Sequence, residues 1–279
     1  MRTMVLQSQN IYRGNLILVN REHGYVERTA GFDPAIMDYL VPVQEQQEIR
    51  NQYYVQESPV LLRRGAAVLL SKLMEELHGW RKIVPVSGWR SLGEQQKIWE
   101  NSLADSGEDF TRKYVAVPGH SEHQTGLAID LGLRQEEIDF IRPHFPYTGI
   151  CQTFRERAAD YGFVQRYPDG KETVTEIGHE PWHFRYVGVP HAAVMAEKNM
   201  TLEEYVEFIR EFPYGRNPYR FYRGDQEILI SYLKAEPGGC TRAEIDETTP
   251  YSVSGNNIDG FIITEWRGKH GRTEELRRA

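Results

Sequence analysis

Cysteine is scarce in this chain, and long apolar runs and clusters of basic residues are absent. Among its 279 residues only Cys151 and Cys240 are cysteines, and their wide separation predicts neither a disulfide framework nor a cysteine-ligated zinc site. The opening residues, MRTMVLQSQN, lack the apolar core of a signal peptide, and no apolar run reaches spanning length. We therefore expect a cytoplasmic protein without a transmembrane segment, although a chain that had lost a leader or an anchor would look the same.

The charge balance argues against a nucleic-acid partner. Lysine and arginine number 33 against 40 acidic residues, which gives a net charge of −7, and no basic run stands out. This acidity favours solubility and says little about partners. With 40% hydrophobic residues the chain is long enough for a sizeable core, and we expect one main domain with an appendage. The oligomeric state cannot be read from the sequence.

Hydrophobic periodicity predicts mixed helices and strands over residues 1–211, which we take as the main domain. Ser58-Pro59 fits an N-cap followed by a proline at the first helical position. We expect a strand at 173–177 to pair with the one at 163–167. The predicted strands are 15–20, 82–86, 126–132, 163–167, 173–177 and 182–187, and the predicted helices are 58–79, 92–103, 148–160, 191–198 and 202–211.

The composition changes after Pro213. Residues 214–223 are rich in aromatics and arginine, and later segments alternate like strands at 228–233, 251–254 and 261–264. We interpret 212–279 as a small β-rich C-terminal extension that ends in a charged tail.

The stretch VPGHSEHQTGLAIDL, residues 117–131, holds half of a possible metal site. His123 and Asp130 are seven positions apart, and an extended chain would separate them by about 23 Å. Two ligands of one zinc ion must approach to roughly 3–4 Å. Both can therefore bind one ion only if the segment folds back, and Gly126 is the residue best able to turn it. The residues after the turn suit a buried strand that carries Asp130.

The segment HEPWH, residues 179–183, fits the HExxH pattern of helical zinc proteases, but we reject that interpretation. Pro181 would break the helix at its centre, and the following aromatic and β-branched residues favour a strand. One histidine, His183, then completes a set of three ligands with His123 and Asp130, which leaves a fourth position for water. Glu180 is the nearby carboxylate that could take a proton from that water and pass it to a leaving amine.

SEHQTGLAID and EPWHFRYVG, with the segment SGWRS, resemble the zinc D-Ala-D-Ala carboxypeptidases of the VanY and VanXY type, which share a fold with the dipeptidase VanX. The likeness extends over roughly residues 15–210. It implies an α+β fold of the hedgehog/DD-peptidase kind, in which helices flank a small central antiparallel sheet. It also implies that His123, Asp130 and His183 bind Zn²⁺ and that Glu180 is the catalytic base.

The same resemblance implies roles for three further residues. Arg90 would stabilise the oxyanion of the tetrahedral intermediate, and Ser121 and Gln95 would hold the C-terminal carboxylate of the substrate. A permanently charged guanidinium suits the first role. Each has a plainer interpretation: Arg90 could cap the helix at residue 92, Ser121 could belong to a turn, and Gln95 could be an exposed helix residue.

The expected function is a zinc D,D-carboxypeptidase that removes the last D-Ala from peptidoglycan precursors ending in D-Ala-D-Ala, with glycopeptide (vancomycin) resistance as its context. Ser87 precedes Gly-Trp-Arg where the VanXY branch often has an acidic residue, which favours VanY-like action. The alternatives are a D-Ala-D-Ala dipeptidase or bifunctional enzyme, an L,D-carboxypeptidase or peptidoglycan endopeptidase, and a non-catalytic zinc-binding module. The ligand set would also accept other metals.

Overall fold

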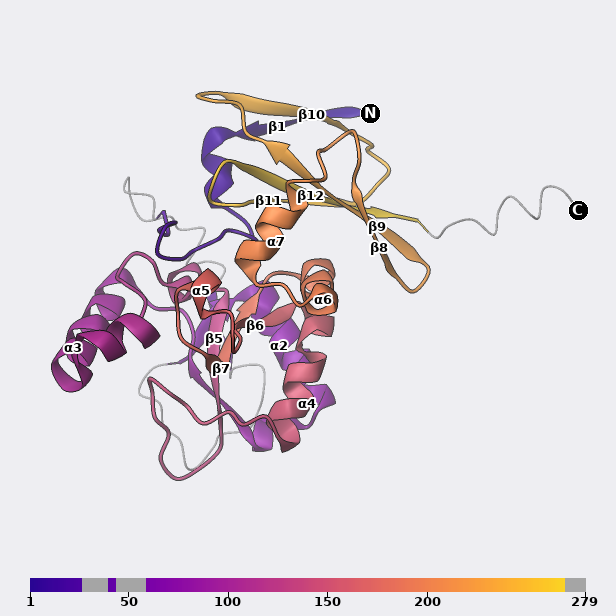
Figure 1. Ribbon diagram of the computed structural model, residues 1–279. Coiled ribbons are helices and arrows are strands. Elements are labelled where there is room, and N and C mark those ends of the chain that lie inside the picture. Colours follow the sequence, from indigo (N-terminus) through magenta and orange to yellow (C-terminus); the bar gives the residue numbers. More distant parts are fainter. Residues whose placement is uncertain (27–39, 44–58, 269–279) are drawn as a thin grey trace, which may run out of the picture. The chain divides into compact units, whose positions relative to one another are not determined.

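A computed structural model describes residues 1–26, 40–43 and 59–268 (Figure 1). The predicted N-cap Ser58 and most of the charged tail lie outside these ranges. The chain divides into two compact units: a central unit, Val19–Thr201, and a terminal unit, Met1–Leu18 with Leu202–Ala279. Residues 1–18 thus belong with the C-terminal strands, whereas the sequence analysis grouped them with the main domain.

The central unit is built on an antiparallel sheet whose strand order, within the described residues, is β4-β5-β7-β6. Its strands are β4 (Ile83–Ser87), β5 (Ala128–Leu133), β6 (Phe163–Tyr167) and β7 (Glu180–Tyr186). A smaller antiparallel pair joins β2 (Leu40–Pro42) to β3 (Leu61–Arg63). The antiparallel pairing and the surrounding helices confirm the α+β fold class.

In the central unit, helices flank this sheet (Figure 1). The α-helices are α2 (Arg64–Glu76), α3 (Leu92–Tyr114), α4 (Gly149–Ala158), α5 (Glu172–Thr175) and α6 (Val189–Lys198). The 3-10 turns are η2 (Gly79–Arg81), η3 (Glu122–Thr125) and η4 (Ala159–Tyr161).

One face of the sheet supplies the core, and alternation along β5 and β7 separates it from a polar face. Ile129, Leu131, Trp182 and Phe184 are buried with residues of α2 and α4. The ring of Phe184 meets that of Phe154 on α4 at 4.9 Å between centroids. Because successive side chains of a strand point to opposite faces, the intervening residues of β5 and β7 point away from this core.

The terminal unit is mostly antiparallel strands, as predicted for residues 212–266. Its helices are η1 (Ser8–Tyr12) and α7 (Leu202–Ile209), and its strands are β1 (Arg2–Gln7), β8 (Tyr219–Arg223), β9 (Gln226–Lys234), β10 (Cys240–Ile245), β11 (Tyr251–Gly255) and β12 (Gly260–Arg267). Strand β1 pairs with β10, and the other strands follow the order β11-β12-β9-β8 in the described part of the unit. No helix among residues 1–26, 40–43 and 59–268 is both long and apolar enough to span a bilayer.

Three predicted elements differ in the structure, and two of them differ because backbone groups find partners that lie far away in the sequence. The predicted strand at 15–20 forms no ladder, since Leu16 N donates to the Ser254 hydroxyl and Leu18 N to a backbone carbonyl. The helix predicted from residue 58 begins at Arg64, because residues 61–63 pair with β2. The predicted strand at 173–177 is wrong: residues 172–175 form the short helix α5.

Helix α3 is longer than the predicted 92–103 and continues past a non-helical Gly107 (φ 82°) to Tyr114. Its start is set by a capping box in which Ser91 Oγ accepts from Glu94 N and the Glu94 carboxylate accepts from Ser91 N at 2.7 Å. This cap places Arg90 directly before the helix, at the junction with β4.

Replacing Gly126 with alanine should destabilise the protein more than the same change at Gly149. Both glycines have a positive φ, 69° and 55°, which costs an alanine about 1–2 kcal/mol. A Cβ at Gly126 would also lie 2.8 Å from Leu40 Cδ2, whereas nothing lies within 4 Å of one at Gly149. Urea unfolding of both variants measures the difference, and equal stabilities would show that the contact relaxes without cost.

Candidate active site

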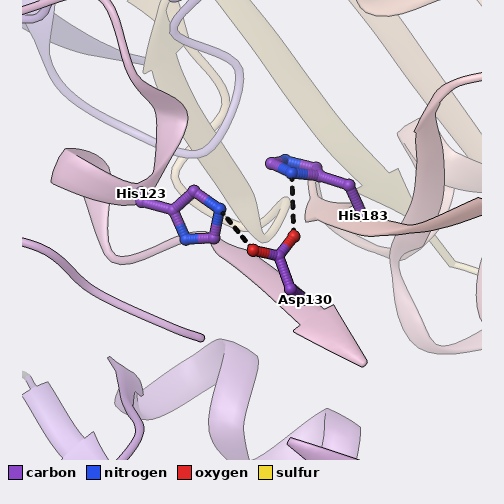
Figure 2. A group of neighbouring side chains, drawn as sticks. All are labelled: His123, Asp130 and His183. Atoms are coloured by element: carbon purple, nitrogen blue, oxygen red, sulfur yellow. Dashed lines mark ion pairs between the residues drawn. The ribbon is translucent and has the colours of Figure 1, made fainter. Parts of the chain in front are cut away.

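Two strands and one turn bring His123, Asp130 and His183 together (Figure 2). Asp130 on β5 and His183 on β7 are directly paired residues of the antiparallel ladder. Directly opposed residues point to the same face with their Cβ atoms about 4.5–5.5 Å apart. Because Ile129 and Phe184 face the core, both polar side chains point to the other face. The strand pairing therefore supplies two of the three candidate ligands.

His123 comes from η3, which ends at Gly126 in the left-handed conformation. The turn folds the chain back before β5, as the sequence predicted, and His123 Nε2 then lies 3.1 Å from Asp130 Oδ2. The imidazole rings of His123 and His183 meet edge to face at 4.9 Å between centroids. The segment 180–186 is a strand and not a helix, which confirms our rejection of the helical HExxH pattern.

The donor atoms of these three residues fit a single cation. One ligand atom from each lies within 4.8 Å of the others, and all three side chains are buried. His123 Nε2 and Asp130 Oδ1 have no hydrogen-bond partner within the described ranges, although each lies 3.1 Å from another member of the cluster. A buried polar atom without a hydrogen bond calls for an explanation. Here a metal ion supplies one, because the donor atoms lie close to one another and could share it. Two imidazoles and one carboxylate with an open side are a donor set that suits catalytic Zn²⁺.

Each histidine turns a different nitrogen toward Asp130. His123 uses Nε2, because its Nδ1 lies 2.6 Å from the Gly88 carbonyl oxygen. His183 uses Nδ1, which lies 3.1 Å from Asp130 Oδ1. The same Nδ1 is 3.4 Å from Glu180 Oε2, so the predicted base lies against the cluster.

Burial and charge shift the acidities within the cluster. Burial raises the pKa of Glu180 to about 8, although the neighbouring His183 opposes the shift. Burial, helped by the Arg90 charge, lowers the pKa of His123 to about 4. Burial also opposes protonation of His183, but the Asp130 carboxylate outweighs it and raises the His183 pKa to about 9. The pKa of Asp130 falls well below its usual range despite burial, because both histidines face it.

Arg90 reaches the cluster from the β4–α3 junction. Its guanidinium lies 3.4 Å from Asp130 Oδ2 and donates to Gln95 Oε1 at 3.2 Å. Gln95 is almost fully buried and also donates to the Ala116 carbonyl at 2.8 Å. Gln95 is therefore not the exposed helix residue of the plainer interpretation, and the Arg90 side chain points into the cluster, away from the cap of α3.

A cavity of about 40 Å³ opens onto these groups. All seven residues singled out from the sequence line it, including the buried Ser121. Apolar side chains close its walls, among them Ile98, Ile177 and Trp182. The cavity therefore combines a cationic side chain, a carboxylate and a candidate metal site with small apolar surfaces.

Sequence reasoning missed a buried ion-pair network behind the cluster. Glu122 Oε1 accepts from Arg166 Nε at 2.8 Å and from Arg185 at 2.7 Å, and all three side chains are fully buried. The two guanidinium groups hold the pKa of Glu122 well below its usual range despite burial. One signal was available in the sequence: Arg185 follows His183 by two positions on an otherwise aromatic strand, so the two share a face.

Two further histidines, His120 and His179, lie close to the two motifs in sequence. Neither belongs to the metal cluster found among the described residues. His120 Nδ1 lies 2.8 Å from the Asn20 carbonyl oxygen, and His179 Nε2 lies 2.7 Å from the Tyr147 hydroxyl. Neither joins the three ligand candidates.

Known proteins are similar to this chain in sequence and in fold. Residues 60–189 match the family model VanY, D-alanyl-D-alanine carboxypeptidase. The bifunctional D-Ala-D-Ala dipeptidase and D-Ala-D-Ala carboxypeptidase VanXYC of Enterococcus gallinarum is 47% identical over 127 residues, 45% of this chain and 67% of that protein. The vancomycin-resistance D,D-dipeptidase VanXYg, solved with a D-Ala-D-Ala phosphinate analogue, is 48% identical with a TM-score of 0.85, covering 95% of this chain and 99% of that one.

A second solved structure contains the metal. The vancomycin-resistance D,D-pentapeptidase VanY of a VanB-type cassette, in complex with Zn(II), is 26% identical with a TM-score of 0.50, covering 69% of this chain and 98% of that one. Since the relatives are peptidases of one family and the fold matches nearly end to end, this chain belongs to the VanY family of D-alanyl-D-alanine carboxypeptidases and is a peptidase.

Proposed function

We propose that this chain is a zinc-dependent D,D-carboxypeptidase that removes the last D-Ala from peptidoglycan precursors ending in D-Ala-D-Ala. The observation that carries the proposal is the convergence of His123, Asp130 and His183, with Glu180 and Arg90 on the same cavity. A zinc ion held by the three ligands would polarise the scissile carbonyl and acidify a water molecule. Removal of the D-Ala-D-Ala end would withdraw the target of vancomycin, and resistance to that antibiotic is the context we infer.

Glu180 is the proposed proton carrier. Its carboxylate lies 3.4 Å from His183 Nδ1, beside the three ligands and within the cavity. From there it would accept the proton of the attacking water and deliver it to the amine of the departing D-Ala. A structural zinc site has no use for such a base, so Glu180 favours an enzyme over a binding module.

Arg90, Ser121 and Gln95 are proposed to bind the substrate. Arg90 offers a fixed positive charge where the carbonyl oxygen becomes negative. Ser121 would donate its hydroxyl to the terminal carboxylate. Gln95 gives one amide hydrogen to Ala116 and has a second for the substrate, while its oxygen holds Arg90 in place. All seven residues belong to the central unit, so we assign catalysis to residues 19–201.

Hydrolysis of free D-Ala-D-Ala is the second candidate. It is favoured by the likeness over 95% of this chain to the D,D-dipeptidase VanXYg, and by the bifunctional VanXYC. Both reactions break the same bond between two D-Ala residues, so one cavity can serve both.

Substrate comparison tests the proposal. Zinc-loaded protein is offered, side by side, a pentapeptide stem ending in D-Ala-D-Ala, the free dipeptide and a tetrapeptide stem, and released D-Ala is measured. We expect D-Ala from the pentapeptide. Release from the dipeptide alone would replace the carboxypeptidase with the dipeptidase, and release from the tetrapeptide would indicate an L,D-carboxypeptidase.

Glu180→Gln should lower kcat by about 100–10,000-fold, because the general base is lost. Zinc content, measured by atomic emission after dialysis, should stay at the wild-type level, since Glu180 is not a proposed ligand. Glu176→Gln, a change at an exposed carboxylate four residues earlier, is the control and should leave both unchanged. Unaltered cleavage by Glu180→Gln would refute the role of this residue.

Arg90→Ala should lower kcat by about 100–1000-fold, as expected for a lost oxyanion contact, with a much smaller effect on zinc content. Steady-state kinetics and metal analysis on the same preparation separate the two effects. Arg81→Ala, which removes an exposed arginine, serves as the control. Equal losses of activity and zinc would mean that Arg90 has a structural role.

A further inference from the structure

The buried carboxylate of Glu122 uses its two oxygens differently. Oε1 accepts hydrogen bonds from Arg166 and from Arg185 at 2.8 and 2.7 Å. Oε2 makes no hydrogen bond to a described residue and lies 3.6 Å from His183 Nε2. The arginines therefore fix the carboxylate from one side, and its free oxygen faces the imidazole from the other.

His183 lies between two sets of acidic groups. Its Nδ1 faces Asp130 at 3.1 Å and Glu180 at 3.4 Å, toward the centre of the ligand cluster. Its Nε2 faces Glu122 and is buried without a hydrogen bond inside the described ranges. The ring thus presents one nitrogen to the proposed metal position and the other to a fixed acceptor.

A neutral imidazole can bind a metal through only one nitrogen, and the other nitrogen carries the hydrogen. An acceptor beside that second nitrogen selects the tautomer and the ring orientation. For His123 the acceptor is the Gly88 carbonyl oxygen, 2.6 Å from Nδ1, which leaves Nε2 for the metal. For His183 the corresponding acceptor is Glu122, and the selected tautomer is the opposite one.

We propose that Glu122 is a positioning residue that holds His183 in the Nε2–H tautomer, with its Nδ1 lone pair directed at the metal. The inference rests on the proposed metal site, and it adds a residue that touches neither metal nor substrate. Arg166 and Arg185 act one step further out: because both donate to the same oxygen, they keep the other oxygen available to His183.

The first test uses wild-type protein with ¹⁵N-labelled histidine. Two-dimensional NMR that correlates ring nitrogens with ring protons should show the His183 of the zinc-loaded protein with its proton on Nε2 alone. Without zinc, the raised pKa of His183, about 9, predicts a proton on both ring nitrogens at neutral pH. Zinc should shift the Nδ1 resonance of His183 and the Nε2 resonance of His123. In the zinc-loaded protein, a His183 ring that carries its proton on Nδ1, or binds zinc through Nε2, would overturn the proposal without any variant.

The second test is Glu122→Gln, which keeps the length of the side chain and removes the charge. Competition with a fluorescent chelator should show zinc binding weakened about 10–100-fold, as for other partners of metal-ligating histidines. The His183 tautomer should become mixed in the same NMR spectrum. Zinc affinity within twofold of wild type, in a variant with wild-type circular dichroism, would contradict the proposal.

Glu227→Gln is the matched control. Glu227 is also a buried carboxylate that accepts from an arginine, Arg220, but it belongs to the terminal unit and does not line the cavity. Its replacement should leave zinc affinity and the His183 tautomer unchanged. If Glu122→Gln does not fold, the wild-type NMR result decides alone. Wild-type protein that binds zinc as described but hydrolyses no D-Ala-D-Ala substrate would refute the proposed function and leave this inference standing.

Discussion

The pairing of β5 with β7 is the constraint on which the rest of the site depends. Its register sets Asp130 opposite His183, so two candidate ligands point to the same face of the sheet. A slip of one residue would turn one of them toward the core, where Ile129 and Phe184 now pack. The apolar face therefore fixes the position of the polar one, because the two sets of side chains alternate along the same strands.

Buried charge is the second constraint, and it is balanced on both sides of the cluster. Asp130 and Glu180 face Arg90 across the cavity, while Glu122 faces Arg166 and Arg185 behind it. An unpaired buried carboxylate would cost several kcal/mol or take up a proton. The arginines allow the acidic groups to remain charged although they are buried. The candidate metal ligands lie in this same buried region, where burial also raises the pKa of the base Glu180.

The predictions that held are those in which local sequence and tertiary environment agree. Pro181 excludes a helix, and residues 180–186 form a strand. Gly126 adopts the left-handed conformation that a reversal between His123 and Asp130 requires. Two of the errors share one cause: backbone groups took partners from distant segments. Residues 61–63 join β2 in place of a helix. Leu16 and Leu18 bond to Ser254 and Asn256 in place of a ladder.

By itself, the sequence determined the chemistry available to this protein: the residue types, their order and the strand that carries His183. Local periodicity also predicted a mixture of helices and strands and the β-rich character of residues 212–266, whereas the resemblance to a known family implied the α+β class. Only the tertiary structure decided which nitrogen of each histidine faces Asp130, and that Glu122 stands behind His183 with Arg166 and Arg185. Glu122 on η3 lies 44 residues before Arg166 on β6 and 63 residues before Arg185 on β7. No local pattern encodes contacts between side chains that only folding brings together.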